Sequence, residues 1–352
     1  MTSLQATLEK RRLQSIGDCR AYPSSFNHSQ SLALCVLLAL LAIAMTATAM
    51  LGAYNISFVS LANILVGHPE PDIVSQHILI NIRLPRIFMA VVVGAALGVS
   101  GATMQALFRN PLAEPGLVGL SAGASLGAVC AIVLTSGGLL LTGSFAFLGS
   151  LLATYLAYIL GQRAQGMSGL LLAGIAINTI VLSVMGLIIV QANDAQLRDL
   201  TFWNMGSLAG ATWKVLMVLV PIVIFGLTIL MSRWRVLNAL LLGDRETYHL
   251  GYNLKTIRWQ TLILVALTVG PLVAVTGGIG FVGLVVPHLV RRVLGADHRW
   301  VMPASALGGA FALVLSDGFA RVLLAPAELP IGLITSLIGG PFFVWLLIRG
   351  QK

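Results

Sequence analysis

Two pairs of charged residues are the part of this sequence whose types and spacing could do chemistry. Arg83 and Arg86, in the segment RLPR, lie three residues apart and would share one face of a helix. Asp317 and Arg321 lie four residues apart, which predicts an ion pair along a helix. A charge in hydrocarbon is costly and is therefore a candidate for function. The two arginines could bind an acidic partner, and snorkelling to the membrane interface is the alternative.

Ser100 could be a nucleophile. The segment from Gly98 to Gly101 (GVSG) is similar to the motif of membrane-embedded serine proteases, in which a histidine of another helix activates the serine. His288 is the one histidine close to an apolar stretch. Helix packing explains Ser100 better, because small residues let helix backbones approach closely.

Trp203 and Met205 could contact a planar, apolar ligand, since methionine can ligate haem iron. The alternative is that the tryptophan anchors the chain at the membrane interface and the methionine packs in the core.

Motifs for ATP hydrolysis and for metal binding are absent from the sequence. No segment matches Gly-x-x-x-x-Gly-Lys-[Ser/Thr], the loop that cradles nucleotide phosphates. Cys19, Cys35 and Cys130 are odd in number and irregularly spaced, so they indicate neither disulfides nor a metal site. We also expect almost no charge in the apolar core, and hence no carboxylate relay for an ion-driven carrier. The energy for any transport must then come from another chain.

Ten apolar stretches must position these residues, each about the 20 residues that a helix needs to cross ~30 Å of hydrocarbon. They begin near Ser31, Leu84, Gly116, Gly137, Ser168, Trp213, Gln260, Gly278, Val301 and Pro330. With the N-terminus in the cytoplasm, most of the 21 lysines and arginines fall inside: Lys10, Arg11, Arg12, Arg20, Arg109, Arg163, Arg233, Arg235, Arg245, Lys255, Arg258, Arg291, Arg292, Arg299, Arg349 and Lys352. The remainder lie outside: Arg83, Arg86, Arg198, Lys214 and Arg321. This asymmetry follows the positive-inside rule and predicts an all-α polytopic membrane protein of ten transmembrane helices, with both termini cytoplasmic.

The composition agrees with a membrane protein. With 57% hydrophobic residues, 9% charged residues and a mean hydropathy of +0.93, the chain has too little polar surface for a water-soluble body. The net charge of +9 is scattered rather than gathered on one face, so nucleic acid is not an expected partner. We predict a cytoplasmic tail over residues 1–30 and a single transmembrane domain over residues 31–352. The first apolar run is long enough to span the membrane, which argues against a cleaved signal peptide.

Three longer connections interrupt the apolar stretches. Residues 55–81 lie outside and contain an amphipathic stretch, Ile56 to Val66, that we expect on the membrane surface. Residues 191–212 also lie outside, and residues 233–258 form a charged segment inside.

A faint repeat relates the two halves of the chain. The segment GLVGL at residues 116–120 opens the third apolar stretch, and GFVGL at residues 280–284 opens the eighth. An odd number of spans separates them, so the copies would cross the membrane in opposite directions. This predicts an inverted repeat of spans two to five and seven to ten, although so short a match can also arise by chance.

Several motifs together resemble the permease subunits of binding-protein-dependent ABC importers for haem, iron siderophores and cobalamin. They are RLPR (83–86), SGATMQ (100–105), NPLAEPG (110–116), LGDRETYHLG (242–251), GFVGLVVPHLVR (280–291), ELPIG (328–332) and GGP (339–341). The resemblance implies a ten-helix permease that forms a homodimer, with the substrate passing along the dimer interface. It also implies two cytoplasmic ATPase subunits, which use ATP and magnesium, and one periplasmic substrate-binding protein.

The same resemblance assigns roles to residues. Arg83, Arg86 and Arg321 would receive carboxylates of the binding protein. The segment 233–258 would couple to the ATPase through Leu242, Gly243, Asp244, Glu246, Leu250 and Gly251. The candidates for the pathway and its gate are Leu112, Met167, Ser168, Asn178, Trp203 and Met205.

The loop from Phe202 to Trp213 looks most like that of the haem permeases. We therefore expect haem as the transported substrate, with ferric siderophore next and cobalamin third, and no cofactor held by this chain. The expected location is the bacterial inner membrane, in contact with lipid. The rival reading is an ion-coupled secondary transporter.

Overall fold

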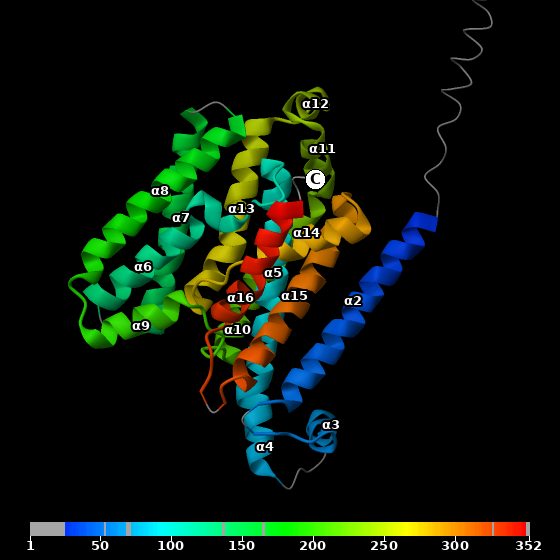
Figure 1. Cartoon of the computed structure of the whole chain (residues 1–352), viewed down its shortest axis with the longest axis vertical. Helices are drawn as coiled ribbons and strands as arrows, with labels where there is room; N and C mark the ends of the chain where they lie inside the picture. The colour runs from blue at the N-terminus through cyan, green and yellow to red at the C-terminus, as the bar shows by residue number, and fades with distance from the viewer. Residues whose placement is uncertain are drawn as a thin grey trace, which may run out of the picture.

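The computed structural model describes residues 25–52, 54–67, 72–135, 138–163, 166–325 and 327–349, and every regular element in them is a helix. Ten helices match the ten predicted stretches in order: α2 (Ser25–Met50), α5 (Leu84–Phe108), α6 (Leu120–Leu134), α7 (Leu139–Arg163), α8 (Gly166–Ile189), α10 (Trp213–Ser232), α13 (Leu254–Thr276), α14 (Val282–Leu294), α15 (His298–Val322) and α16 (Ile331–Arg349). They form one bundle (Figure 1). Most of the predicted tail and the basic residues before Arg83 lie outside the described residues.

The helices differ in length from the prediction. In the described residues, 7 helices are long and apolar enough to cross a membrane, whereas α6 has 15 residues and α14 has 13. The eighth stretch is short because the backbone from Gly277 to Phe281 is not helical and both of these residues have positive φ. Ten complete crossings therefore stay a prediction.

The three long connections contain the shorter helices α3 (Phe58–Val66), α4 (Ile73–His77), α9 (Asp194–Asn204), α11 (Trp234–Leu242) and α12 (Asp244–His249). Helix α3 covers the predicted amphipathic stretch from Phe58 onward, and the Ser57 side chain caps it by accepting a hydrogen bond from the Ser60 amide. Its place on the membrane surface stays a prediction. Asn193 and Gln196 form a capping box at the start of α9.

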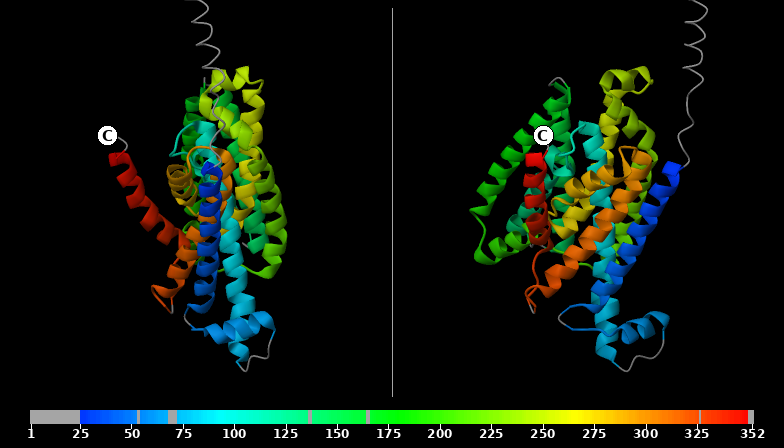
Figure 2. Two further views of the ribbon diagram at one scale, coloured as in Figure 1. Left: turned by 90° about the vertical axis from the view of Figure 1, so that its right-hand side faces the viewer. Right: turned by 45° about the vertical axis from the view of Figure 1, so that its right-hand side comes forward.

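The two ends of the bundle carry different elements. Helices α11 and α12 lie at the end where α2 begins and α16 finishes, and α3 and α4 lie at the opposite end (Figures 1 and 2). The segment 233–258 and the C-terminal helix end are thus on one side, as the charge distribution predicts.

Helix α5 runs through the centre of the bundle and packs against α15 and α14. A Cβ at Gly98 would lie 2.0 Å from the Ser305 carbonyl oxygen, and one at Gly101 would lie 1.8 Å from that of Gly283. Only glycine allows backbones to approach so closely, which confirms the predicted role of small residues in packing. Ser100, next to Gly101, is fully buried.

Helix α5 continues a helical segment that begins earlier in the chain. The chain is helical from Ile73, and the segment Ile78–Arg83 forms a π-helix directly before Leu84. Proline inside a helix removes a hydrogen bond and its ring clashes with the preceding turn, so a widened turn before Pro85 accommodates it.

Candidate functional site

A cluster of charged residues lies at the end of the bundle that carries α3 and α4. Arg86 pairs with Asp317 (Nε to Oδ1, 2.8 Å) and with Glu328 (Nη1 to Oε2, 2.7 Å). Asp317 also pairs with Arg321 (Oδ2 to Nε, 3.1 Å), which confirms the predicted i, i+4 ion pair. The Asp317 side chain is 1% exposed and that of Glu328 is 50% exposed. Asp317 thus holds α5 to α15, and Glu328 covers the outside of the cluster.

Arg83 and Arg321 hold the end of α2. Arg83 donates to the backbone carbonyls of Ala49 (2.7 Å), Met50 (3.0 Å) and Tyr54. Arg321 donates to the Thr48 carbonyl (3.1 Å). The last turn of a helix leaves carbonyls without intrahelical partners, and guanidinium groups satisfy them here.

The three arginines predicted to dock a binding protein are therefore buried and occupied within the chain. Their docking role stays a prediction, and it must operate from a covered position. The sequence analysis missed two ion pairs of Arg86. One joins it to Asp317, which is far away in the chain. The other joins it to Glu328, which is part of the motif ELPIG. Asp317 and Arg321, the expected exceptions to an uncharged core, are joined in this cluster by Arg86.

The segment between α10 and α13 folds into α11 and α12, joined at Gly243. Gly243 has φ 123°, a backbone conformation that side-chain-bearing residues rarely adopt. The buried Thr247 hydroxyl donates to the Ala239 carbonyl (2.8 Å) and can also donate to that of Gly243 (2.5 Å), which fixes the angle between the two helices. Gly251, with φ 85°, lies in the turn after α12.

Asp244 connects this segment to the bundle. Its carboxylate pairs with Arg109, at the end of α5 (3.1 Å), and with Arg258, in α13 (2.7 Å). Leu242, Tyr248 and Leu250 are instead 64%, 70% and 58% exposed. Exposed large apolar side chains beyond the long helices make this end a candidate contact surface for another protein.

The predicted pathway residues do not gather in one place. Asn178 donates to the Gly116 carbonyl (Nδ2 to O, 3.4 Å), so it holds α8 to the turn before α6. The Leu112 amide donates to Asn110 Oδ1 (2.9 Å) within the loop after α5. Ser168 is exposed in the first turn of α8. The side chain of Met167 lies outside the described part of the chain.

Trp203 and Met205 lie where the end of α9 packs tightly against the end of α13 and the start of α16. A Cβ at Gly277 would lie 1.9 Å from the Trp203 carbonyl oxygen, and one at Gly332 would lie 2.1 Å from that of Met205. The Ser207 amide donates to the Thr276 carbonyl (2.7 Å). The loop after α9 therefore joins the end of α13 to the start of α16, with both side chains only partly exposed.

Glu114, between α5 and α6, carries a partly buried carboxylate that the sequence analysis did not single out. It faces a cavity of about 290 Å³ that both glycine motifs line, including Gly116, Ser121, Gly280 and Phe281. Burial raises the pKa of the Glu114 carboxyl, and the Phe281 amide, which donates to it, opposes this in part. In the described residues, no basic side chain pairs with it. A signal for this site is present in NPLAEPG, an acid between two prolines directly before an apolar stretch.

The long apolar helices of the described residues indicate an integral membrane protein. The chain belongs to the FecCD transport family, whose model matches residues 38–349. It is 46% identical over 326 residues to the hemin transport system permease protein HmuU of Yersinia pestis, covering 90% of this chain and 95% of the relative. It is 42% identical over 279 residues to the vitamin B12 import system permease protein BtuC of Salmonella typhimurium, covering 77% and 84%.

A solved structure shares the fold. A chain of an inward-facing metal-chelate type ABC transporter matches with a TM-score of 0.81 and 32% identity, over 90% of this chain and 98% of that chain. The resemblance that the motifs indicate is therefore confirmed at the level of family and fold.

Proposed function

We propose that this chain is the permease subunit of an ATP-driven importer that carries haem across the bacterial inner membrane. The observation that carries the proposal is the 46% identity to a hemin permease over nearly the whole of both chains. The 42% identity to a vitamin B12 permease keeps cobalamin as the alternative, and the metal-chelate transporter structure keeps ferric siderophore.

The working unit in this proposal is a dimer of the chain, with ten crossings and an inverted repeat. We assign the dimer face to α8 and α16, whose exposed apolar side chains include Leu172, Leu187, Leu337 and Ile338. A second copy facing these helices would enclose a path between the two subunits, with cytoplasmic termini at the end of α11 and α12.

Energy would come from two cytoplasmic ATPase subunits that bind α11 and α12. The exposed Leu242, Tyr248 and Leu250 would contact the ATPase, together with Glu246. Asp244 has a different part in this scheme. Its ion pairs with Arg109 and Arg258 would transmit movement of α12 to α5 and α13.

A periplasmic binding protein would dock at the opposite end through exchange of carboxylates. Glu328 is half exposed and holds one side of Arg86. A carboxylate of the binding protein that displaces Glu328 would gain a charge-assisted bond to Arg86, while Asp317 keeps the arginine in place. Exchange of this kind is reversible and sensitive to salt.

Transport into vesicles distinguishes the three cargoes. The permease is reconstituted with its ATPase and binding protein, and ATP-dependent uptake of hemin, a ferric siderophore and cobalamin is measured side by side. We expect hemin uptake well above that of the others. Equal or greater uptake of cobalamin or siderophore would reassign the cargo within the same machine.

A further inference from the structure

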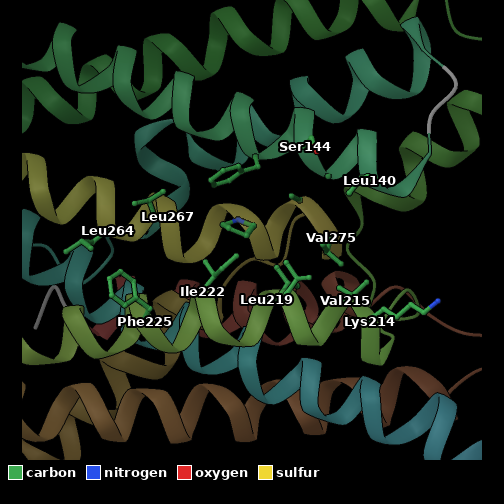
Figure 3. A pocket seen from close by; sticks show the side chains of 16 residues that line it. Leu140, Ser144, Lys214, Val215, Leu219, Ile222, Phe225, Leu264, Leu267 and Val275 are labelled. Atoms are coloured by element: carbon green, nitrogen blue, oxygen red, sulfur yellow. The ribbon is translucent and has the colours of Figure 1, made fainter.

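An apolar groove runs along one flank of the bundle, and none of its lining residues lies on the proposed dimer helices α8 and α16. It has a volume of about 540 Å³ and lies between α7, α10 and α13. Figure 3 shows Lys214 and Leu140 at one end of the groove and Phe225 and Leu264 towards the other. Leu140, Val218 and Phe225 are exposed along its rim, so the groove opens to the side, where a membrane protein meets lipid.

On the α7 wall of the groove, Gly143 faces open space. A Cβ at Gly143 would have the Ala274 carbonyl oxygen, 4.0 Å away, as its nearest neighbour. On the floor, α10 and α13 are in close contact, since a Cβ at Gly226 would lie 2.2 Å from the Thr268 hydroxyl. The helices thus meet below the groove and leave space above it.

The groove is about as long as one leaflet is thick. Lys214 and Phe225 are eleven residues apart on α10, which at the rise of an α-helix is roughly 16 Å. Half of a ~30 Å hydrocarbon core is about 15 Å. A single acyl chain lying in the groove would therefore extend from the membrane surface to the middle of the bilayer.

The outer end of the groove is suited to an anion. Lys214 is exposed and is the charged residue among the described residues that line the groove. It is the second residue of α10, where helix amides favour negative charge. Trp213 beside it donates to the Ile80 carbonyl (2.8 Å) and packs on Phe88 (centroids 5.8 Å apart), as an aromatic anchor at headgroup level does.

From these features we propose that the groove binds an anionic phospholipid of the leaflet on the α3 side, with one acyl chain between α7, α10 and α13 and the phosphate at Lys214. An apolar wall that ends at a single cation fits a lipid with a negative headgroup better than a neutral one. The proposal also gives a use to a lysine on the side of the membrane where basic residues are scarce. It concerns a different face from the docking and coupling surfaces.

Native mass spectrometry of the purified full chain tests the site, with phosphatidylglycerol and phosphatidylcholine of the same acyl chains as probes. We expect the wild type to retain more phosphatidylglycerol. Lys214→Gln should reduce that preference about fivefold, which is the contribution of one basic residue to the attraction of an anionic membrane surface. Lys214→Arg should keep the preference. Lys255→Gln is the matched control, because Lys255 is the exposed second residue of α13 at the other end of the bundle.

Gly143→Leu tests the groove itself. The added side chain would occupy space where the acyl chain lies, so binding of both lipids should fall. An unchanged lipid preference in Lys214→Gln would overturn the proposal. So would a change of oligomeric state in Gly143→Leu without loss of lipid, which would make the groove an interface between copies of the chain. If Gly143→Leu does not fold, the two Lys214 variants decide the question alone.

Discussion

Arg86 in α5 and Asp317 in α15 form a buried ion pair, with 2.8 Å between Arg86 Nε and Asp317 Oδ1. The same carboxylate pairs with Arg321, and Arg321 holds the end of α2. Three helices from distant parts of the chain are thus held together through one aspartate. Reversing the charge of Arg86 would therefore disturb the fold as well as the docking surface.

Asp317→Asn should destabilise the protein strongly. Removing one partner of a buried pair leaves the other charge uncompensated, which costs about 3–5 kcal/mol. Glu328→Gln is the matched control, since its side chain is half exposed and the loss should stay below about 1 kcal/mol. Unfolding of the purified protein in increasing concentrations of a denaturing detergent measures both. Similar losses in the two variants would contradict the central position of Asp317.

Glu328→Gln should also strengthen docking of the binding protein. The variant weakens the competitor for Arg86 without moving the arginine, so an incoming carboxylate has less to displace. We expect tighter binding at low salt and a smaller difference at high salt, measured with the permease in nanodiscs. Weaker binding would instead show that Glu328 itself contacts the partner.

Two variants of the coupling segment should fail in different ways. Leu250→Glu places a charge on the exposed apolar surface and should abolish binding of the ATPase. Asp244→Asn removes the ion pairs to Arg109 and Arg258, and should leave the ATPase bound but lower transport for each ATP hydrolysed. Co-purification and the ratio of uptake to hydrolysis separate the two effects. Loss of ATPase binding in Asp244→Asn would argue against a role in transmission.

Glu114→Gln should change how stability depends on pH. Burial raises the pKa of the Glu114 carboxyl, so the folded protein binds this proton more tightly than the unfolded chain does. The wild type then loses stability as the pH rises from about 4.3, the usual carboxyl value, through the raised pKa. Glutamine keeps the oxygen that accepts from the Phe281 amide but does not ionise. The stability of the variant relative to the wild type should increase with pH, and a constant difference from pH 4 to 8 would count against a buried ionising carboxyl.

Local patterns predict the helices and the Asp317–Arg321 pair, because periodicity and i, i+4 spacing are properties of neighbouring residues. Tertiary relationships leave no such local signal. Arg86 and Asp317 meet only because α5 and α15 pack through Gly94, Gly98 and Gly309. Helix α14 is short because Gly277 and Phe281 have positive φ. The apolar composition of the stretch does not predict this backbone conformation. Glu114 becomes partly buried only because both glycine motifs line the same cavity.

The central claim is that this chain is a passage operated by a separate motor. It is tested most directly by hemin uptake into vesicles that contain the permease, with and without the ATPase subunits, under an imposed proton or sodium gradient. We predict uptake only when the ATPase, ATP and the binding protein are all present. Uptake that follows the ion gradient in vesicles without the ATPase would contradict the account.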